Sequence, residues 1–144
     1  PDFVRGTNTT PKPAEPNYLE GDTDGQYAYK ACRTPWRIAS DYLLSGDRRA
    51  LATVSKINTW IRAQTDDKPE LMRAGYTLDG EAAVSYYNTT FAALFGVSAM
   101  VEADNQDWLN AVWQQVMKTS VEEGDYYSNT LKLLAMIVMS GNWW

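Results

Sequence analysis

Three carboxylates lie close together near the start of this chain, in a segment interrupted by glycines. Glu20, Asp22 and Asp24 occur within YLEGDTDGQYAY, and residues 18–24 are called the carboxylate loop below. The chain contains no histidine, so any proton transfer must use carboxylates, tyrosine or lysine. A carboxylate in such a loop can remove a proton from water and make the water a nucleophile. The loop is therefore a candidate for a general base.

Two other interpretations of the carboxylate loop remain open. Aspartate and glycine together form turns, and charged side chains keep an exposed loop soluble, which needs no chemistry at all. A calcium loop is a further candidate. The spacing here lacks the regular alternation and the closing glutamate of an EF-hand.

Aromatic and cationic side chains follow the carboxylate loop directly. Tyr27, Tyr29 and Trp36 offer flat rings of the kind that stack on sugar faces. Arg33 and Arg37 can hold a carboxylate or donate hydrogen bonds to hydroxyl groups. The alternative is that the rings pack in a core and that Arg33 forms a structural salt bridge.

The remainder of the chain carries helical patterns. Residues 1–26 are not periodic and predict an extended loop, and no strong strand or hairpin pattern is present. Thr34-Pro35 suits the start of a helix, Asp47 can cap the next one, Asn88 or Thr89 a third, and Ser128 the last. The predicted helices are 34–44, 48–63, 90–102, 105–118 and 128–140.

The predicted helices alternate in character. Helices 34–44, 90–102 and 128–140 are predicted to be deeply buried, the last two being apolar on most sides, whereas 48–63 and 105–118 each have one polar face. Such alternation favours an inner layer shielded by an outer one, with a compact bundle as the alternative. Five helices can hardly cover the apolar ones on every side, so we expect the chain to be part of a longer protein.

Composition excludes several classes of protein. The 144 residues, 44% hydrophobic and 22% charged, suit one globular domain. A net charge of −5 argues against a nucleic-acid partner, and no apolar run approaches the roughly 20 residues of a membrane span. The single cysteine, Cys32, rules out an internal disulfide. The start at Pro1, without a methionine or signal peptide, indicates a processed or partial chain.

One segment closely resembles a known family. The run YAYKACRTPWR, from Tyr27 to Arg37, is similar to a motif of glycoside hydrolase family eight, and residues 88–101, 105–113 and 126–144 resemble later helices of that family. The resemblance implies an all-α fold, part of an (α/α)6 toroid of six inner and six outer helices. It divides the chain into a catalytic-loop segment, 1–28, and a helical C-terminal half, 29–144.

The resemblance also implies an activity. Family members are inverting hydrolases of β-linked polymers such as cellulose, mixed-linkage glucan, chitosan or xylan-derived oligosaccharides. An inverting enzyme uses an acid and a base roughly 6.5–9.5 Å apart, with a water at the base. The resemblance implies that the acid lies in the N-terminal half, which becomes the expected partner of this chain beside the polysaccharide substrate. It further implies a secreted bacterial enzyme, and no cofactor or metal is expected.

The resemblance assigns roles to particular residues. In one subgroup the base is an aspartate directly after the second tyrosine of the motif, where this chain has Lys30. In another subgroup a glutamate of the preceding long loop is the base, and Glu20 occupies that place, with Asp24 as the reserve candidate. An ammonium group close to Glu20 would keep its carboxylate ionised. The expected substrate-binding residues are Tyr27, Tyr29, Lys30, Arg33, Tyr87 and Tyr126.

Two other functions stay open from the sequence. The chain could be a non-catalytic carbohydrate-binding or scaffold remnant of the same fold, in which Lys30 reflects a loss of turnover. It could also be a helical interaction domain that binds no sugar. Substrate retention without product would indicate the first, and no sugar binding would indicate the second.

Overall fold

The computed structural model describes residues 1–143, which form two compact units. The loop unit comprises Pro1–Arg33 with Arg73–Tyr86, and the helical unit comprises Thr34–Met72 with residues 87–143. The sequence predicts a boundary after residue 28. In the structure the N-terminal segment of the loop unit extends to Arg33, and the connection 73–86 belongs to the same unit.

Five α-helices make up most of the helical unit, in agreement with the prediction. Short 3₁₀ turns at Pro69–Leu71 and Ala103–Asn105 precede α3 and α4. Among residues 1–143 none of the helices is both long and apolar enough to cross a bilayer. The helices are α1 (Thr34–Ser45), α2 (Arg48–Thr65), α3 (Thr89–Ala99), α4 (Gln106–Lys118) and α5 (Tyr126–Met139).

Polar side chains fix where several helices begin. Asp47 caps α2 by accepting a hydrogen bond from the Arg49 amide, as predicted. Its side-chain bond to Arg49, with that amide bond, lowers the pKa of Asp47 to about 2. Asn88 caps α3. The predicted cap of the last helix, Ser128, is wrong, because α5 begins at Tyr126, two residues earlier than predicted, and Asp125 caps it by accepting from the Ser128 amide.

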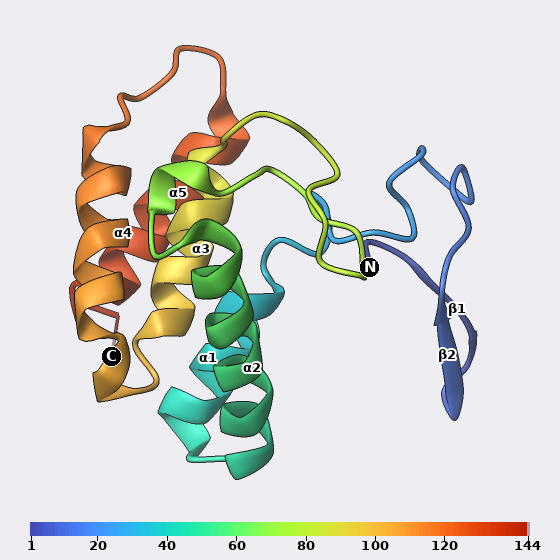
Figure 1. The fold of residues 1–144 in the computed structure, drawn as a ribbon, viewed down its shortest axis with the longest axis horizontal. Coiled ribbons are helices and arrows are strands. Elements are labelled where there is room, and N and C mark those ends of the chain that lie inside the picture. Colours follow the sequence, from blue (N-terminus) through green and yellow to red (C-terminus); the bar gives the residue numbers. More distant parts are fainter. Residues whose placement is uncertain (144) are drawn as a thin grey trace. The chain divides into compact units, whose positions relative to one another are not determined.

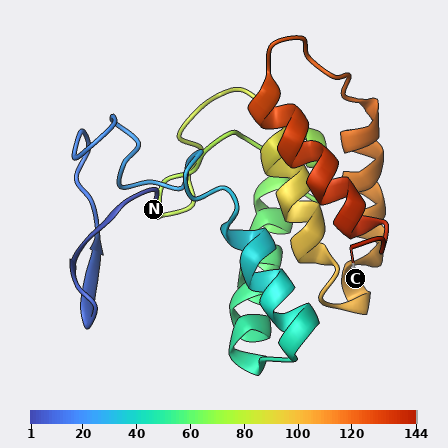
Figure 2. The same ribbon diagram turned by 180° about the vertical axis from the view of Figure 1, so that it is seen from behind.

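Helix α3 is the centre of the helical unit. All of its residues are buried, and it packs against α1, α4 and α5 and to a smaller extent against α2. Helices α1, α3 and α5 run in one direction, while α2 and α4 run back along them (Figures 1 and 2). The buried residues of α2 and α4 lie on one side of each helix. The inner row and the outer row predicted from the alternation are therefore both present.

The two flanking inner helices are less buried than the sequence suggests. Only Pro35 and Ala39 of α1 are buried, and Leu133 of α5 is 60% exposed. Among residues 1–143, α1 packs against α2 and α3, and α5 packs mainly against α3, while Leu44 of α1 is exposed like Leu133 of α5. Part of the surface of α1 and α5 is therefore apolar and uncovered by these residues.

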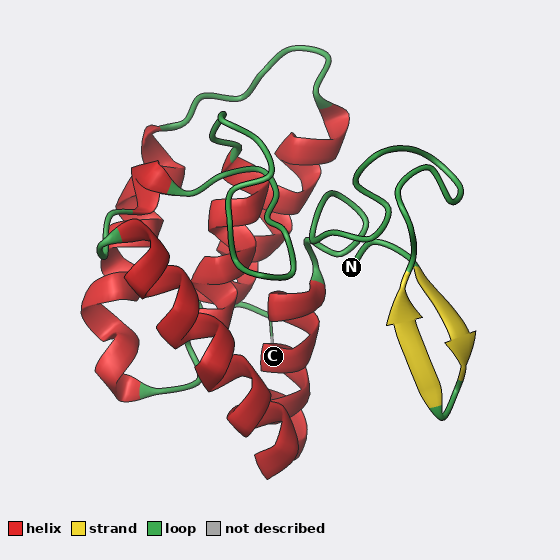
Figure 3. Cartoon of the chain, turned by 45° about the vertical axis from the view of Figure 1, so that its right-hand side comes forward, coloured by secondary structure: helices red, strands yellow, loops and turns green. Residues whose placement is uncertain are grey.

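The loop unit contains a β-hairpin that the sequence does not indicate. Strand β1 (Val4–Thr7) pairs antiparallel with β2 (Thr10–Pro13), and both are exposed throughout (Figure 3). The prediction of a structureless segment is wrong here because Pro11 and Pro13 normally argue against a strand. A ribbon of two strands has two free edges, where a residue without an N–H is tolerated.

Candidate active site

Glu20 and Lys30 form an ion pair in the loop unit. The Lys30 Nζ lies 3.1 Å from the Glu20 Oε2, and the two side chains are 49% and 54% exposed. The carboxylate proposed as base is therefore open to solvent and has a cationic neighbour from the motif of residues 27–37. The structure brings together two of the residues singled out from the sequence, although they are ten positions apart.

Asp24, the last residue of the carboxylate loop, holds the loop together. Its side chain accepts hydrogen bonds from three consecutive amides, those of Leu19 (2.6 Å), Glu20 (2.9 Å) and Gly21 (3.0 Å), and the residue is 2% exposed. Burial alone would raise the pKa of Asp24, but these amide bonds outweigh it and lower the pKa. Both oxygens are occupied, so this geometry favours a structural role for Asp24 over its reserve role as base.

Tyr27 ties the motif to the connection 73–86. Its amide and carbonyl both bond to Tyr76 at 2.9 Å, and the two rings are 6.5 Å apart. The Tyr27 hydroxyl donates to the Cys32 carbonyl at 3.1 Å. Tyr27, expected from the resemblance to touch sugar, thus supports the turn between residues 27 and 32 from within the loop unit.

The remaining motif residues of the loop unit lie around the same turn. The Tyr29 hydroxyl is 3.4 Å from the Tyr86 hydroxyl, and the Arg33 Nη2 donates to the Lys30 carbonyl at 3.4 Å. Asp2 accepts hydrogen bonds from the amides of Ala28 and Ala31 at 2.8 and 2.9 Å. The sequence does not point to Asp2 or Tyr86. Their hydrogen-bond partners lie 26 to 57 positions away along the chain, and such distant pairs leave no local pattern of residues.

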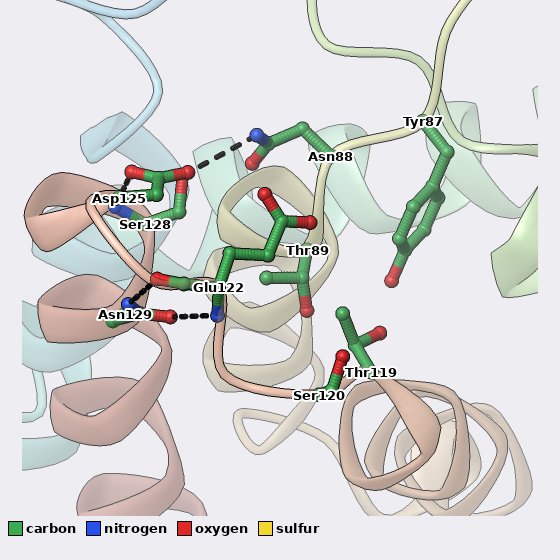
Figure 4. A pocket seen from close by; sticks show the side chains of 9 residues that line it. All are labelled: Tyr87, Asn88, Thr89, Thr119, Ser120, Glu122, Asp125, Ser128 and Asn129. Carbon is green, nitrogen blue, oxygen red and sulfur yellow. Dashed lines mark hydrogen bonds between the residues drawn. The ribbon is translucent and has the colours of Figure 1, made fainter.

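Tyr87 and Tyr126 belong to the helical unit. Tyr126 is 83% exposed at the start of α5, and Tyr87 borders a pocket of about 60 Å³ between the beginnings of α3 and α5 (Figure 4). Such a volume is too small for a sugar ring and suits a small polar group or a few water molecules. The pocket is lined by Tyr87, Asn88, Thr89, Thr119, Ser120, Glu122, Asp125, Ser128 and Asn129.

Hydrogen bonds stiffen the wall of this pocket. Asn88 donates to the Ser128 hydroxyl at 3.3 Å, which joins the starts of α3 and α5. Asn129 and the Glu122 backbone exchange two hydrogen bonds, at 2.8 and 3.2 Å. The Tyr87 hydroxyl and the Thr89 Oγ1 are buried and find no partner among residues 1–143. These two groups leave hydrogen-bonding capacity within the pocket.

Acidic side chains do not gather into a metal site in the described part of the chain. Residues 1–143 contain no group of three or more cysteine, aspartate or glutamate side chains that could hold a metal ion. The acidic residues of the carboxylate loop are instead bonded within the loop unit. Asp22 accepts from the Asn17 side chain at 2.7 Å.

Comparison with known proteins shows that the chain as a whole is similar to glucanases. No protein-family model matches the chain. A β-glucanase of Niallia circulans is 49% identical over 144 residues, which are 100% of this chain and 35% of that protein. The apo structure of a β-1,3-1,4-glucanase from Paenibacillus sp. X4 superposes with a TM-score of 0.94 at 49% identity, covering 100% of this chain and 38% of that one.

The fold also matches that of a more distant enzyme whose family is known. A family eight glycoside hydrolase from Teredinibacter turnerae, solved with xylobiose, has a TM-score of 0.74 at 20% identity, over 92% of this chain and 33% of that one. The chain thus spans about a third of the length of the proteins it matches. It has the fold of a segment of glycoside hydrolase family eight, and it is homologous along its whole length to a β-glucanase.

Proposed function

We propose that this chain is the C-terminal part of an inverting endo-glycoside hydrolase and supplies its general base, Glu20. The observation that carries the proposal is the 49% identity to a β-glucanase over every residue of the chain. Glu20 suits the role because its carboxylate is half exposed and pairs with Lys30, on a loop whose backbone is anchored.

The proposed reaction is a single displacement at the anomeric carbon. Glu20 removes a proton from a water molecule, whose oxygen attacks the anomeric carbon while the bond to the leaving sugar breaks. An acid on the opposite face of the sugar protonates the departing oxygen. We assign that acid to the remaining two thirds of the enzyme, so this chain alone should have no activity.

We propose β-1,4-linked polysaccharide as the substrate, with mixed-linkage β-glucan first. The names of two relatives, β-glucanase and β-1,3-1,4-glucanase, support a glucan over chitosan or xylan. Tyr29, Arg33, Tyr87 and Tyr126 are the proposed sugar contacts besides Lys30. A polymeric substrate also suits an enzyme secreted from the cell, which fractionation of the producing bacterium would test.

The decisive experiment uses the complete enzyme and soluble mixed-linkage β-glucan. Glu20→Gln should reduce kcat by about 10²- to 10⁴-fold, since general base catalysis contributes that much. Asp22→Asn, a carboxylate two positions away in the same loop, is the matched control and should keep the activity. Full activity of Glu20→Gln would refute the assignment of the base.

Small anions provide a second test of the same role. Azide needs no deprotonation, so in Glu20→Ala it can replace the activated water and form a glycosyl azide of inverted configuration. Polymer binding without any hydrolysis by the unmodified enzyme would favour the non-catalytic remnant instead. The absence of both binding and hydrolysis would favour the interaction domain.

A further inference from the structure

The backbone of the carboxylate loop converges on one buried side chain. The amides of Leu19 and Glu20 both point at the Asp24 Oδ2, and the amide of Gly21 points at the Oδ1. Three successive N–H groups around one anion form a concave backbone nest of the kind that binds anions in other proteins. Here the anion belongs to the chain itself, and the middle donor is the backbone of the proposed base.

Asp24 is itself fixed to the rest of the loop unit. Its carbonyl accepts from the Phe3 amide at 2.8 Å, and its amide donates to the Gly21 carbonyl at 3.2 Å. The following residue, Gly25, packs so closely that a Cβ there would lie 2.1 Å from the Ala14 carbonyl oxygen. The carboxylate is therefore attached to a backbone that neighbouring segments hold in place.

The charged form of Asp24 is the one that this geometry requires. A carboxylate offers acceptor sites to all three amides, whereas an asparagine side chain would turn N–H groups toward at least one of them. Charge-assisted hydrogen bonds of this type are roughly twice as strong as neutral ones. The lowered pKa of Asp24 agrees with an anchor that is ionised at neutral pH.

We infer that Asp24 is a positioning residue that fixes the backbone of Glu20, while Lys30 holds the carboxylate end of the same residue. This inference rests on the proposed function of Glu20. A base must stay within hydrogen-bond reach of its water, and a misplacement of about 1 Å can cost about 100-fold in rate. A half-exposed glutamate on a free loop would sample many positions; the Asp24 anchor restricts its backbone, and the exposed Lys30 pair adds a weaker restraint on its carboxylate.

The kinetic test compares Asp24→Asn with Asp22→Asn in the complete enzyme. Asp24→Asn should lower kcat by about 10- to 100-fold with KM within about twofold, because the base moves and the sugar contacts stay. Asp22 is exposed and accepts no backbone amide of the loop, so Asp22→Asn should keep both constants. A wild-type kcat in Asp24→Asn would overturn the inference.

Amide hydrogen exchange at neutral pH gives a readout that does not depend on activity. The amides of residues 19–21 should be protected in the unmodified enzyme and in Asp22→Asn, and should exchange at least tenfold faster in Asp24→Asn. Unprotected amides in the unmodified enzyme would refute the anchor, whether or not the variant folds. Full activity of Glu20→Gln would instead refute the proposed function and leave the exchange result intact.

Discussion

The Lys30 ammonium lies 3.1 Å from the Glu20 carboxylate, although the position of Lys30 is acidic in one subgroup of the family that the motif resembles. A cation cannot act as the base, so under the proposed function Lys30 is a partner of the Glu20 carboxylate. Both side chains are about half exposed, which keeps the interaction weak and sensitive to salt.

Replacement of Lys30 should therefore have a modest effect on the complete enzyme. Exposed ion pairs contribute about 0.2–1 kcal/mol, which corresponds to at most about a fivefold change in rate. We expect Lys30→Met to lower kcat on β-glucan by about two- to fivefold at low ionic strength. The difference should shrink in 1 M NaCl, and Lys30→Arg should recover part of the loss.

Lys56→Met provides the control for Lys30, because Lys56 is exposed on α2. Its kcat should stay within error of the unmodified enzyme at both salt concentrations. A loss of more than 100-fold in Lys30→Met would mean that Lys30 takes part in the chemistry itself and would contradict the partner role.

The stability of the protein should fall in acid over a defined pH range. Asp47 has a pKa of about 2 when folded, against an ordinary value near 3.9 when unfolded, and the pKa values of Asp24 and Asp125 are also lowered. Carboxylates whose pKa is lower in the folded than in the unfolded state stabilise the fold above about pH 4. This contribution is lost as the pH falls toward 2. The urea midpoint measured against pH should show this decline.

Asp47→Asn should reduce the pH dependence between about pH 4 and 2, because asparagine can still cap α2 but does not titrate. Asp79→Asn, at an exposed position in the connection 73–86, should leave the slope unchanged. An unaltered slope in Asp47→Asn would show that other carboxylates cause the acid unfolding.

Gly96 should not tolerate even a methyl group. A Cβ there would lie 2.5 Å from the Met139 Sδ and 2.9 Å from the Val112 Cγ1, where α3, α4 and α5 meet. We expect Gly96→Ala to destabilise the protein by about 1–3 kcal/mol in urea unfolding, despite the better helix propensity of alanine. The double variant with Met139→Ala should show less than the sum of the two single losses, since the shortened side chain gives the methyl group room.

A buried polar pair joins α2 to α3. Asn58 donates to the Ser98 carbonyl at 2.8 Å and accepts from the Ser98 hydroxyl at 2.6 Å, and both residues are almost fully buried. Asn58→Ala leaves the Ser98 carbonyl and hydroxyl without these bonds. It should lower the free energy of unfolding by about 1–3 kcal/mol. Thr59→Ala, which removes an exposed hydroxyl bonded only within α2, should change the unfolding free energy by less than about 0.5 kcal/mol.

The exposed side of α5 should be covered in the complete enzyme. Leu133 is 60% exposed here, and its burial by further helices would contribute about 1.5–3 kcal/mol. Leu133→Ser should therefore destabilise the complete enzyme by a similar amount and leave this chain alone nearly unchanged. Equal effects in both would mean that the face remains exposed in the complete enzyme.

Local patterns in the sequence determined most of the helical unit. The five helices, their alternation and the caps at Asp47 and Asn88 follow from periodicity and end signals within a few residues. The predicted start of α5 is two residues too late because Asp125 and Ser128 both suit a cap, and only the backbone decides between them. The hairpin at Val4–Pro13 was missed because its prolines are unfavourable in most strands.

The arrangement around Glu20 depended on tertiary structure. The sequence named Glu20 and Lys30 as separate candidates, but their ion pair requires the chain to fold back over ten residues. The sequence likewise gave no sign that Asp24 would turn inward to bind three amides, because a turn-forming aspartate and an anchoring one have the same local neighbours. Periodicity reports which face of a helix is buried, whereas the position of a loop side chain depends on hydrogen bonds between distant segments, and these form only in the folded chain.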